Sequence, residues 1–150
     1  MPKRYPKFPQ EMKEGVAVKV TYSDSKEICK DQLQDLFKSV AWKSSDYPNE
    51  LFQAMKNSHS VITAWNQDEL IGLVNALSDG VMTVYFHYML VHPNYQNQGI
   101  GQQMLDLILS RYEGYKNKLL IAYENAESFY RKAGFKPEDG TVAMFITEMV

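Results

Sequence analysis

One stretch of this chain combines residue types and spacing that suit the binding of a phosphate-bearing ligand. In Gln96-Asn97-Gln98-Gly99-Ile100-Gly101, two glycines stand where a helix is expected to begin. Free backbone N–H groups and the positive end of the helix dipole make such a helix start an anion site, and glycine lets a ligand approach closely. The spacing therefore predicts phosphate binding at this loop.

The glycine loop must be held between a strand and a helix. Residues 85–92 combine β-forming and aromatic residues without a formal charge, which is typical of a strand buried on both faces. Pro93 and Asn94 end this strand, because proline cannot continue a ladder and asparagine favours turns. Residues 99–112 form the expected helix, with apolar residues at helical spacing: Ile100, Met104, Leu105, Ile108, Leu109 and Tyr112.

Two other nucleotide-binding loops are disfavoured by the neighbouring residues. A Walker loop ends in Gly-Lys-Ser/Thr, but Gln102 and Gln103 follow Gly101. A dinucleotide fingerprint requires a third small residue where Met104 stands. It also requires an acidic ribose ligand at the end of the next strand, and the apolar run 119–122 ends without one.

A family resemblance rests on two segments. Leu90-Val91-His92-Pro93, Gln96 and Gly99-Ile100-Gly101 resemble motif A, Q/R-x-x-G-x-G/A, of the GNAT superfamily of N-acetyltransferases. Phe129-Tyr130-Arg131-Lys132-Ala133-Gly134-Phe135 resembles the F-Y-x-x-x-G-F signature of that superfamily's last helix. The two segments occur in the family's order, and the resemblance extends over residues 16–149.

The resemblance implies acetyl-CoA as the cofactor. The backbone of the glycine loop would hold its pyrophosphate, with Gln96 and Gln98 as neutral side-chain donors. The strand before the loop would splay from its neighbour and bind the pantetheine arm through backbone groups. Asn125, which opens the last helix, stands five residues before Tyr130, whereas the family's asparagine often stands seven before it. The expected cofactor-binding residues are Met89, Leu90, Val91, Gln96, Asn97, Gln98, Gly99, Ile100, Gly101, Gln102, Asn125 and Tyr130.

Two catalytic groups are expected. Tyr130 matches the family's tyrosine that protonates the departing thiolate; with reference pKa values near 10 and 8.5, this transfer is uphill by about 2 kcal/mol. Where some members carry a glutamate base, this chain has Tyr85. Alternation along the strand predicts that Tyr85, His87 and Met89 share one face. His87 can then accept the proton of the amine, directly or through water; the alternative is a packed, hydrogen-bonded histidine with deprotonation by ordered waters.

The acceptor pocket is expected between the first two helices and the splayed strands, lined by Phe37, Trp42, Tyr85, His87 and Phe145. Because these residues offer no carboxylate pair, a polycationic substrate has little support. The predicted activity is acetyl transfer from acetyl-CoA to a primary amine of a small molecule, or to a peptide N-terminus or lysine, by direct attack in a ternary complex. A silent acyl-CoA sensor and a scaffold that dimerises through its sheet edge are the alternatives.

Bulk properties limit these predictions. The chain has 150 residues, the length of one ordinary domain, and its formal net charge of −2 gives no reason to expect nucleic-acid binding. We expect no metal. No apolar run approaches the length of a membrane span, and the single cysteine, Cys29, fits a reducing cytoplasm. Residues 1–15 are expected to form an extended arm, and residues 16–150 a single GNAT domain with a possible homodimer as its assembly.

The predicted fold is mixed α/β. The order is β-α-α-β-β-β-α-β-α-β, which matches the GNAT fold with its splayed central sheet. Asp24 or Ser25 is expected to cap the first helix. The expected strands are 16–22, 60–65, 70–76, 85–92, 119–122 and 141–147, and the expected helices contain 28–40, 46–57, 99–112 and 125–133.

Overall fold

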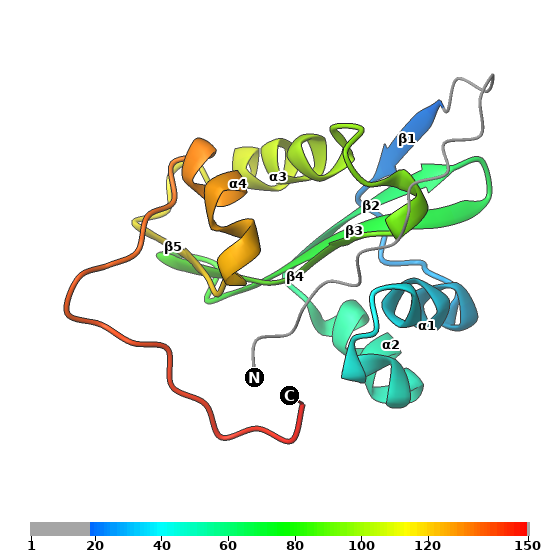
Figure 1. Ribbon diagram of the computed structural model, residues 1–150, viewed down its shortest axis with the longest axis horizontal. Helices are drawn as coiled ribbons and strands as arrows, with labels where there is room; N and C mark the ends of the chain where they lie inside the picture. Colours follow the sequence, from blue (N-terminus) through cyan, green and yellow to red (C-terminus); the bar gives the residue numbers. More distant parts are fainter. Residues whose placement is uncertain (1–18, 150) are drawn as a thin grey trace.

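A five-stranded mixed sheet with helices on both faces forms the described part of the chain, residues 19–149 of the computed structural model (Figure 1). The predicted arm 1–15 and residues 16–18 of the strand predicted at 16–22 lie outside the described residues. The strands are β1 Val20–Ser23, β2 Ser60–Asn66, β3 Glu69–Ser78, β4 Thr83–Val91 and β5 Asn117–Leu120. The α-helices are α1 Lys30–Ser39, α2 Pro48–Asn57, α3 Ile100–Ser110 and α4 Glu127–Lys132.

The strands lie in chain order, β1-β2-β3-β4-β5. Neighbours from β1 to β4 are antiparallel, and β5 runs parallel to β4 after the crossover through α3. The mixed α/β fold predicted from the sequence is therefore confirmed for these elements. Helices α1 and α2 cover one face of the sheet, and α3 and α4 cover the other (Figure 1).

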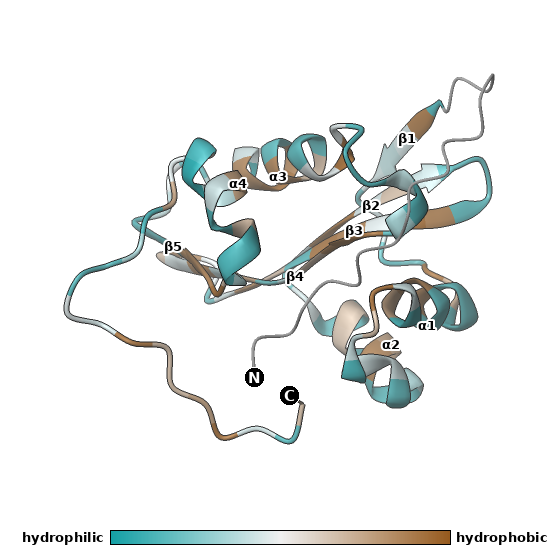
Figure 2. Cartoon of the chain, in the orientation of Figure 1, coloured by the Kyte–Doolittle hydropathy of each residue, from teal (hydrophilic) through white to brown (hydrophobic). Residues whose placement is uncertain are grey.

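The sequence pattern explains why each helix packs on the sheet. In α1, Leu33, Leu36 and Phe37 follow helical spacing and are at most 1% exposed. In α3, Met104 and Ile108 also follow helical spacing; they pack on the opposite face of the sheet and are fully buried. Apolar colour accordingly concentrates where the helices face the central strands (Figure 2). Burying each such side chain stabilises the fold by about 1.5–3 kcal/mol.

The strand β4 separates from β5 halfway along its length. The two strands pair only from Thr83 with Asn117 to Phe86 with Leu120, whereas β4 continues to Val91. Beyond Phe86, β4 pairs with β3 alone, through Met89, Leu90 and Val91, and an opening begins beside this part of the strand. This is the splay that the family resemblance implied.

A β-bulge lies at the start of that opening. Between the pairs Val74–Met89 and Ala76–Phe86, β3 contributes only Asn75, whereas β4 contributes two residues. The buried Asn75 side chain accepts a hydrogen bond from the Tyr88 backbone N–H at 2.7 Å and donates one to Ser58 Oγ at 3.1 Å. Asn75 thus supplies a partner that the interrupted ladder lacks, and it holds the bulge in place.

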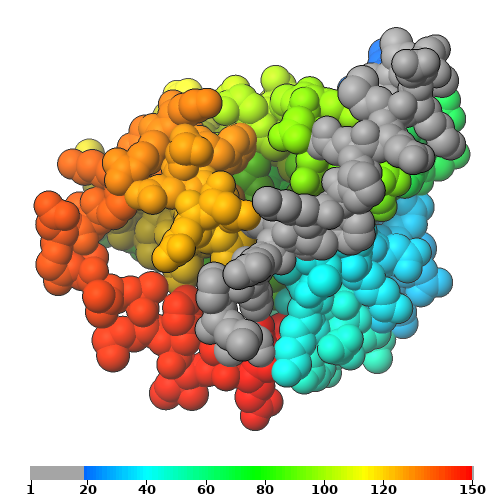
Figure 3. Space-filling view, in the orientation of Figure 1, coloured from blue at the N-terminus to red at the C-terminus, as the bar shows by residue number. Residues whose placement is uncertain are grey.

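The C-terminal strand predicted at 141–147 is absent. This segment has no regular secondary structure, and Val142, Met144 and Ile146 are 81%, 86% and 107% exposed. The tail leaves the end of α4 and follows the edge of the molecule toward the layer of α1 and α2 (Figure 3). The prediction was wrong because β propensity describes fitness for a paired, half-buried surface, and this segment lies against no strand edge among residues 19–149.

The first helix begins later than its predicted caps. The Ser23 and Ser25 hydroxyls accept hydrogen bonds from the backbone N–H groups of Ser25 and Glu27, both at 3.1 Å. These local turns occupy the polar residues before Cys29, which becomes the N-cap without a side-chain bond. The other helices lie within the predicted ranges, with ends shifted by a few residues.

Candidate active site

The glycine loop adopts the backbone conformation that its sequence requires. Asn97 and Gly99 have positive φ angles of 61° and 80°, and Gly99 directly precedes α3. The first intrahelical bond runs from Gln103 N–H to the Gly99 carbonyl, at 3.0 Å. The N–H groups at the start of α3 therefore have no acceptor within the helix and are directed outward from its positive end.

A cavity of about 700 Å³ opens beside this loop, between the end of β4 and α4. We call it the loop cavity. The expected cofactor-binding residues line it, with one exception, Gln98. Gln96 lines it but uses its side-chain amide to bond the Val91 carbonyl, at 3.0 Å. Four further residues that were not predicted also line it: Tyr95, Ala126, Phe129 and Lys132.

Only alternate backbone groups of β4 face the opening. His92 N–H bonds the Ile71 carbonyl at 2.7 Å, which places Leu90 and Leu73 in the next hydrogen-bonded pair of the same register. The N–H and C=O groups of Met89 and Val91 then point away from β3, toward the splayed side. The expectation for Leu90 is therefore corrected: it lines the cavity, but its backbone groups are directed to β3.

A second cavity, of about 520 Å³, lies between β4, the end of β5 and the segment after α1. We call it the aromatic cavity, because Trp42, Tyr85, His87, Tyr88 and Tyr123 line it. Met89 and Tyr130 line both cavities, so the two meet at these side chains. Phe145 also lines the aromatic cavity from the exposed tail.

The bulge changes which side chains share a face. Phe86 and Met89, three residues apart, both pack in the cluster on the α3 side of the sheet. Tyr85 and His87 stack with ring centroids 5.5 Å apart, and His87 stacks on Tyr88 at 3.9 Å. The prediction that Met89 shares a face with Tyr85 and His87 was wrong, because the extra residue reverses the alternation beyond the bulge.

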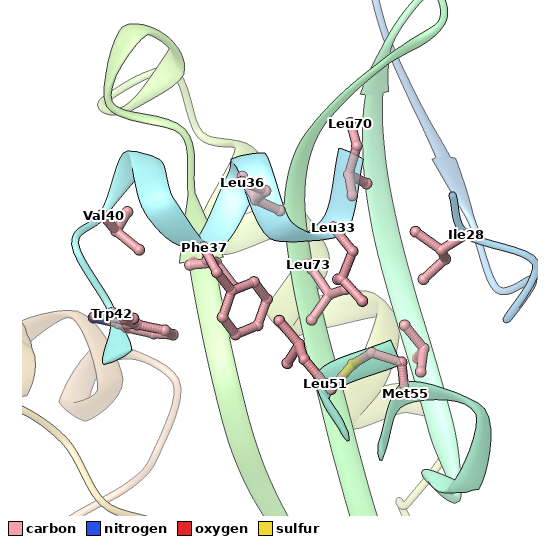
Figure 4. Close-up of a cluster of buried hydrophobic side chains, with 12 residues drawn as sticks. Ile28, Leu33, Leu36, Phe37, Val40, Trp42, Leu51, Met55, Leu70 and Leu73 are labelled. Carbon is pink, nitrogen blue, oxygen red and sulfur yellow. The ribbon is translucent and has the colours of Figure 1, made fainter. Parts of the chain in front are cut away.

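Phe37 lies behind the cavity wall. Its ring is fully buried and packs edge-on against Trp42 and Tyr88, with centroids 5.8 and 5.0 Å away. Figure 4 shows it pointing into the cluster between the helices and the sheet. The expected pocket role of Phe37 is therefore corrected to a supporting one, since its helical face is turned to the core.

Tyr88 takes the place in the wall that was expected for Phe37. Its hydroxyl shares a hydrogen bond of 2.7 Å with Ser44 Oγ. Neither residue was predicted, nor was Asn75, although a polar residue within the apolar run Leu73–Ala76 is a visible signal.

The two candidate proton carriers, Tyr130 at the junction and His87 in the aromatic cavity, have unbonded polar atoms. The Tyr130 ring packs against Phe129 and Phe135, and burial raises its pKa to about 12. Partial desolvation lowers the pKa of His87 below its usual value of 6.5, so its imidazole is mainly neutral at pH 7. Within residues 19–149, neither the Tyr130 hydroxyl nor the His87 ring nitrogens have a hydrogen-bond partner.

Charge is distributed unevenly between the cavities. Lys132 lines the loop cavity, whereas the described residues lining the aromatic cavity include no Asp, Glu, Lys or Arg. Among residues 19–149, no three His, Cys, Asp or Glu side chains are grouped so that they could hold a metal ion. No helix in the same range is long and apolar enough to cross a membrane.

Comparison with known proteins agrees with this geometry. Residues 57–137 match the family described as "Acetyltransferase (GNAT) domain". The chain is 28% identical over 148 residues to the histone acetyltransferase TAP1 of Glycine max, covering 88% of this chain and 63% of that protein. It is 26% identical over 170 residues to the chloroplastic GCN5-related N-acetyltransferase 2 of Arabidopsis thaliana, covering 97% of this chain and 65% of the relative.

The chain thus spans slightly less than two thirds of the length of these curated relatives. Among solved structures, a GNAT family acetyltransferase from Streptococcus pneumoniae TIGR4 superposes with a TM-score of 0.76 at 25% identity, covering 87% of this chain and 99% of that one. Together with the fold, the splayed strand and the glycine loop, the match over residues 57–137 shows that this chain belongs to the GNAT acetyltransferase family.

Proposed function

We propose that this chain is an N-acetyltransferase that moves an acetyl group from acetyl-CoA to a primary amine by direct attack in a ternary complex. The observation that carries this proposal is the junction of two cavities at Met89 and Tyr130. One cavity is suited to an anionic, amide-bearing ligand and the other to an uncharged one. A group passed between two bound molecules must cross where their sites meet.

The loop cavity fits acetyl-CoA by its chemistry. Outward N–H groups at the start of α3 suit a pyrophosphate, and Lys132 adds a cation at the wall. Gly101 lies beside Met89, Phe129 and Val91, where an added Cβ would sit 3.5–3.8 Å from their side chains. Because glycine has no Cβ, the space between its backbone and these side chains stays open to a ligand. The Met89 backbone groups and the Val91 N–H suit the pantetheine amides, while the Val91 carbonyl already accepts a hydrogen bond from Gln96. When bound, acetyl-CoA supplies the activated acetyl group as a thioester.

Tyr130 is the proposed acid. Its raised pKa keeps the phenol protonated at neutral pH, and its unbonded hydroxyl can donate to the sulfur of the departing thiolate. A pKa of about 12 makes this transfer more uphill than the ~2 kcal/mol difference between unperturbed phenol and thiol. The same burial raises the pKa of the thiol, which offsets part of that increase.

His87 is the proposed proton acceptor for the amine. Its neutral imidazole has no bond to break before it accepts a proton, directly or through a water. The described residues of the aromatic cavity wall carry no charge, so an ammonium ion loses solvation there without gaining a carboxylate from them. The amine is thereby shifted toward its nucleophilic form.

The test is amine-dependent release of the coenzyme A thiol from acetyl-CoA. We expect release to require both substrates and to give intersecting initial-rate lines, as a ternary complex demands. An acyl-CoA sensor would bind acetyl-CoA without any amine raising the release of thiol, and that outcome would overturn the proposal. The unbonded Tyr130 hydroxyl at the cavity junction favours the enzyme over the sensor.

We also propose that the chain forms a homodimer through its C-terminal segment. Among residues 19–149, β5 pairs only with β4, and the β-forming segment 141–147 pairs with nothing. Segment 141–147 of one copy can add to the free edge of β5 in a second copy. Light scattering should then give a dimer mass, and Val142→Lys with Ile146→Lys should give a monomer. A monomeric wild-type protein would contradict this.

The compartment we propose is the cytoplasm. Cys29 is the one cysteine of the chain and is exposed as a free thiol, which suits a reducing environment. Fractionation of the host cells with an antibody against the protein tests this location.

A further inference from the structure

We propose that Tyr95 is a positioning residue for the donor. Its hydroxyl ties the glycine loop to the turn between β2 and β3 and so holds the loop in the shape that receives a pyrophosphate. This inference rests on the proposed binding of acetyl-CoA and deepens it, because it names a residue that acts on the donor through the backbone of the loop. It depends on the two hydrogen bonds of one hydroxyl, on the attachment of the turn and on the exposure of the loop.

The Tyr95 hydroxyl is held between two side chains of the β2–β3 hairpin. It donates to Glu69 Oε2 at 2.8 Å and accepts from Asn66 Nδ2 at 3.0 Å. Asn66 and Glu69 are the last directly paired residues of β2 and β3, so their side chains leave the same face of the sheet next to each other. A phenol suits this place, because its hydroxyl can donate to the carboxylate and accept from the amide at the same time.

The turn of this hairpin is itself fixed by helix α1. The side-chain amide of Gln32 donates to the Asp68 carbonyl at 3.0 Å and accepts from the Leu70 N–H at 2.9 Å. One amide group thus binds the two backbone groups on either side of Glu69. Tyr95 is therefore bonded to a part of the chain that α1 holds in place, so its hydrogen bonds can fix the glycine loop.

Tyr95 stands directly before the segment that needs support. Its ring packs with the cluster on the α3 side of the sheet. Residues 97–99 are exposed, and an added Cβ at Gly99 would meet nothing within 4 Å. Little packing therefore holds this segment, although Asn97 and Gly99 must keep positive φ angles. The loop is fixed from its ends, by α3 on one side and by Tyr95 and Gln96 on the other.

An anchored loop binds an anion with a smaller loss of conformational freedom than a loose one. The N–H groups at the start of α3 can bind the pyrophosphate only while the residues before Gly99 leave them open. Tyr95 lines the loop cavity, but protein side chains already occupy its hydroxyl. Its contribution is therefore to the position of the loop, and it needs no bond to the donor.

The first experiment removes the hydroxyl alone. Tyr95→Phe keeps the ring in its packing and should raise the Kd for acetyl-CoA about three- to tenfold by calorimetry, because the loop must then be ordered on binding. The KM for an amine that the protein acetylates, and kcat at saturating substrates, should change by less than about twofold. The control is Tyr47→Phe, at an exposed tyrosine outside both cavities, which should leave all three constants unchanged.

Two substitutions at Glu69 test the hydrogen bond itself. Glu69→Gln and Glu69→Leu both remove the charge, but only the glutamine oxygen can still accept from the Tyr95 hydroxyl. With Tyr95 present, Glu69→Leu should bind acetyl-CoA about threefold more weakly than Glu69→Gln. In a Tyr95→Phe background the two should bind equally, because no hydroxyl remains to be accepted. A role of Tyr95 in folding alone would not produce this dependence.

The outcomes separate this inference from the proposed function. Folded wild-type protein that does not bind acetyl-CoA would overturn the donor site and the positioning role together. If wild type binds acetyl-CoA, an equal Kd in Tyr95→Phe, or an equal rise in the KM for the amine, would overturn the positioning role alone. If Tyr95→Phe does not fold, the pair at the exposed Glu69 still decides, since equal Kd values for Glu69→Gln and Glu69→Leu would overturn it.

Discussion

The two cavities that meet at Tyr130 are built from different kinds of groups. The loop cavity presents mainly backbone: the start of α3, the loop with Gly99, and the Met89 and Val91 groups that face away from β3. The aromatic cavity presents side chains from segments far apart in the sequence, positioned by a bulge that Asn75 holds. Backbone recognition suits a donor common to the whole family, and side-chain recognition suits an acceptor specific to one member.

The largest predicted effect is at the junction itself. Tyr130→Phe keeps the ring packed against Phe129 and Phe135 but removes the proposed acid. Because general acid catalysis is typically worth about 10²–10⁴-fold, kcat should fall by that factor while the Kd for acetyl-CoA changes little. Single-turnover kinetics with calorimetry measures both. An unchanged rate of the chemical step would show that Tyr130 is not the acid and that its ring only packs against its neighbours.

The second-largest predicted effect is that of replacing His87 in the aromatic cavity. Because the pKa of His87 is lowered, its imidazole is neutral above an inflection that lies below pH 6.5. If it accepts the proton, kcat/KM should rise with pH through that inflection, and His87→Ala should abolish the inflection and lower kcat/KM by about 10²-fold.

Two amines of different basicity provide the control. An inflection that follows the pKa of the amine and survives His87→Ala would assign deprotonation to ordered water instead.

A substitution in the loop cavity should separate donor binding from folding. Gly101→Glu places a carboxylate beside Met89 and Phe129, where a Cβ meets only ordinary contacts, so the fold should persist. Repulsion of the pyrophosphate should weaken acetyl-CoA binding about tenfold or more. The matched control is Gly114→Glu, since Gly114 is exposed with nothing within 4 Å. Equal affinity of wild type and Gly101→Glu by calorimetry would refute the phosphate assignment.

The bulge can be loosened without touching either ligand. Asn75→Ala leaves the Tyr88 N–H and the Ser58 hydroxyl without their partner, which should lower the free energy of unfolding by about 1–3 kcal/mol. Because Tyr88 and His87 are then less fixed, the KM for the amine should rise while the Kd for acetyl-CoA stays constant. Denaturant melts and initial rates test this, with the exposed Asn57→Ala as the control. An equal loss of affinity for the amine and for acetyl-CoA would mean that the bulge supports the whole fold.

The smallest predicted effect is at the charged wall of the loop cavity. Lys132→Met should weaken acetyl-CoA binding about two- to fivefold, and added salt should reduce the difference, because an exposed cation interacts weakly and is screened. Lys116→Met, at an exposed lysine outside both cavities, is the matched control. A loss that is independent of salt would point to packing by the lysine stem.

The contrast between the cavities also explains what the sequence could predict. Gly99 and the apolar spacing of α3 are local signals, because a positive φ angle and a 3.6-residue period leave their mark on adjacent residues. The bulge depends on a polar contact between β3 and β4, so its effect on Met89 could not be read from alternation. The pocket role predicted for Phe37 was wrong, because an aromatic residue on a helix gives the same sequence pattern whether its ring packs in the core or lines a pocket.

The tail shows the same limit. Segment 141–147 has the composition of a strand, but whether it pairs depends on an edge supplied from elsewhere. Pairing across segments is a property of the folded assembly and leaves no local mark on the sequence.

The most direct test of the central claim, that donor and acceptor sites join at Tyr130, is the binding of one molecule that spans both cavities. Coenzyme A can be linked through its sulfur and an acetyl bridge to a primary amine that the protein acetylates. This conjugate should bind more tightly than coenzyme A, compete with both substrates, and lose affinity in both Gly101→Glu and Tyr123→Leu. A conjugate that binds no more tightly than coenzyme A, with an affinity unaffected by Tyr123→Leu, would contradict a joined site.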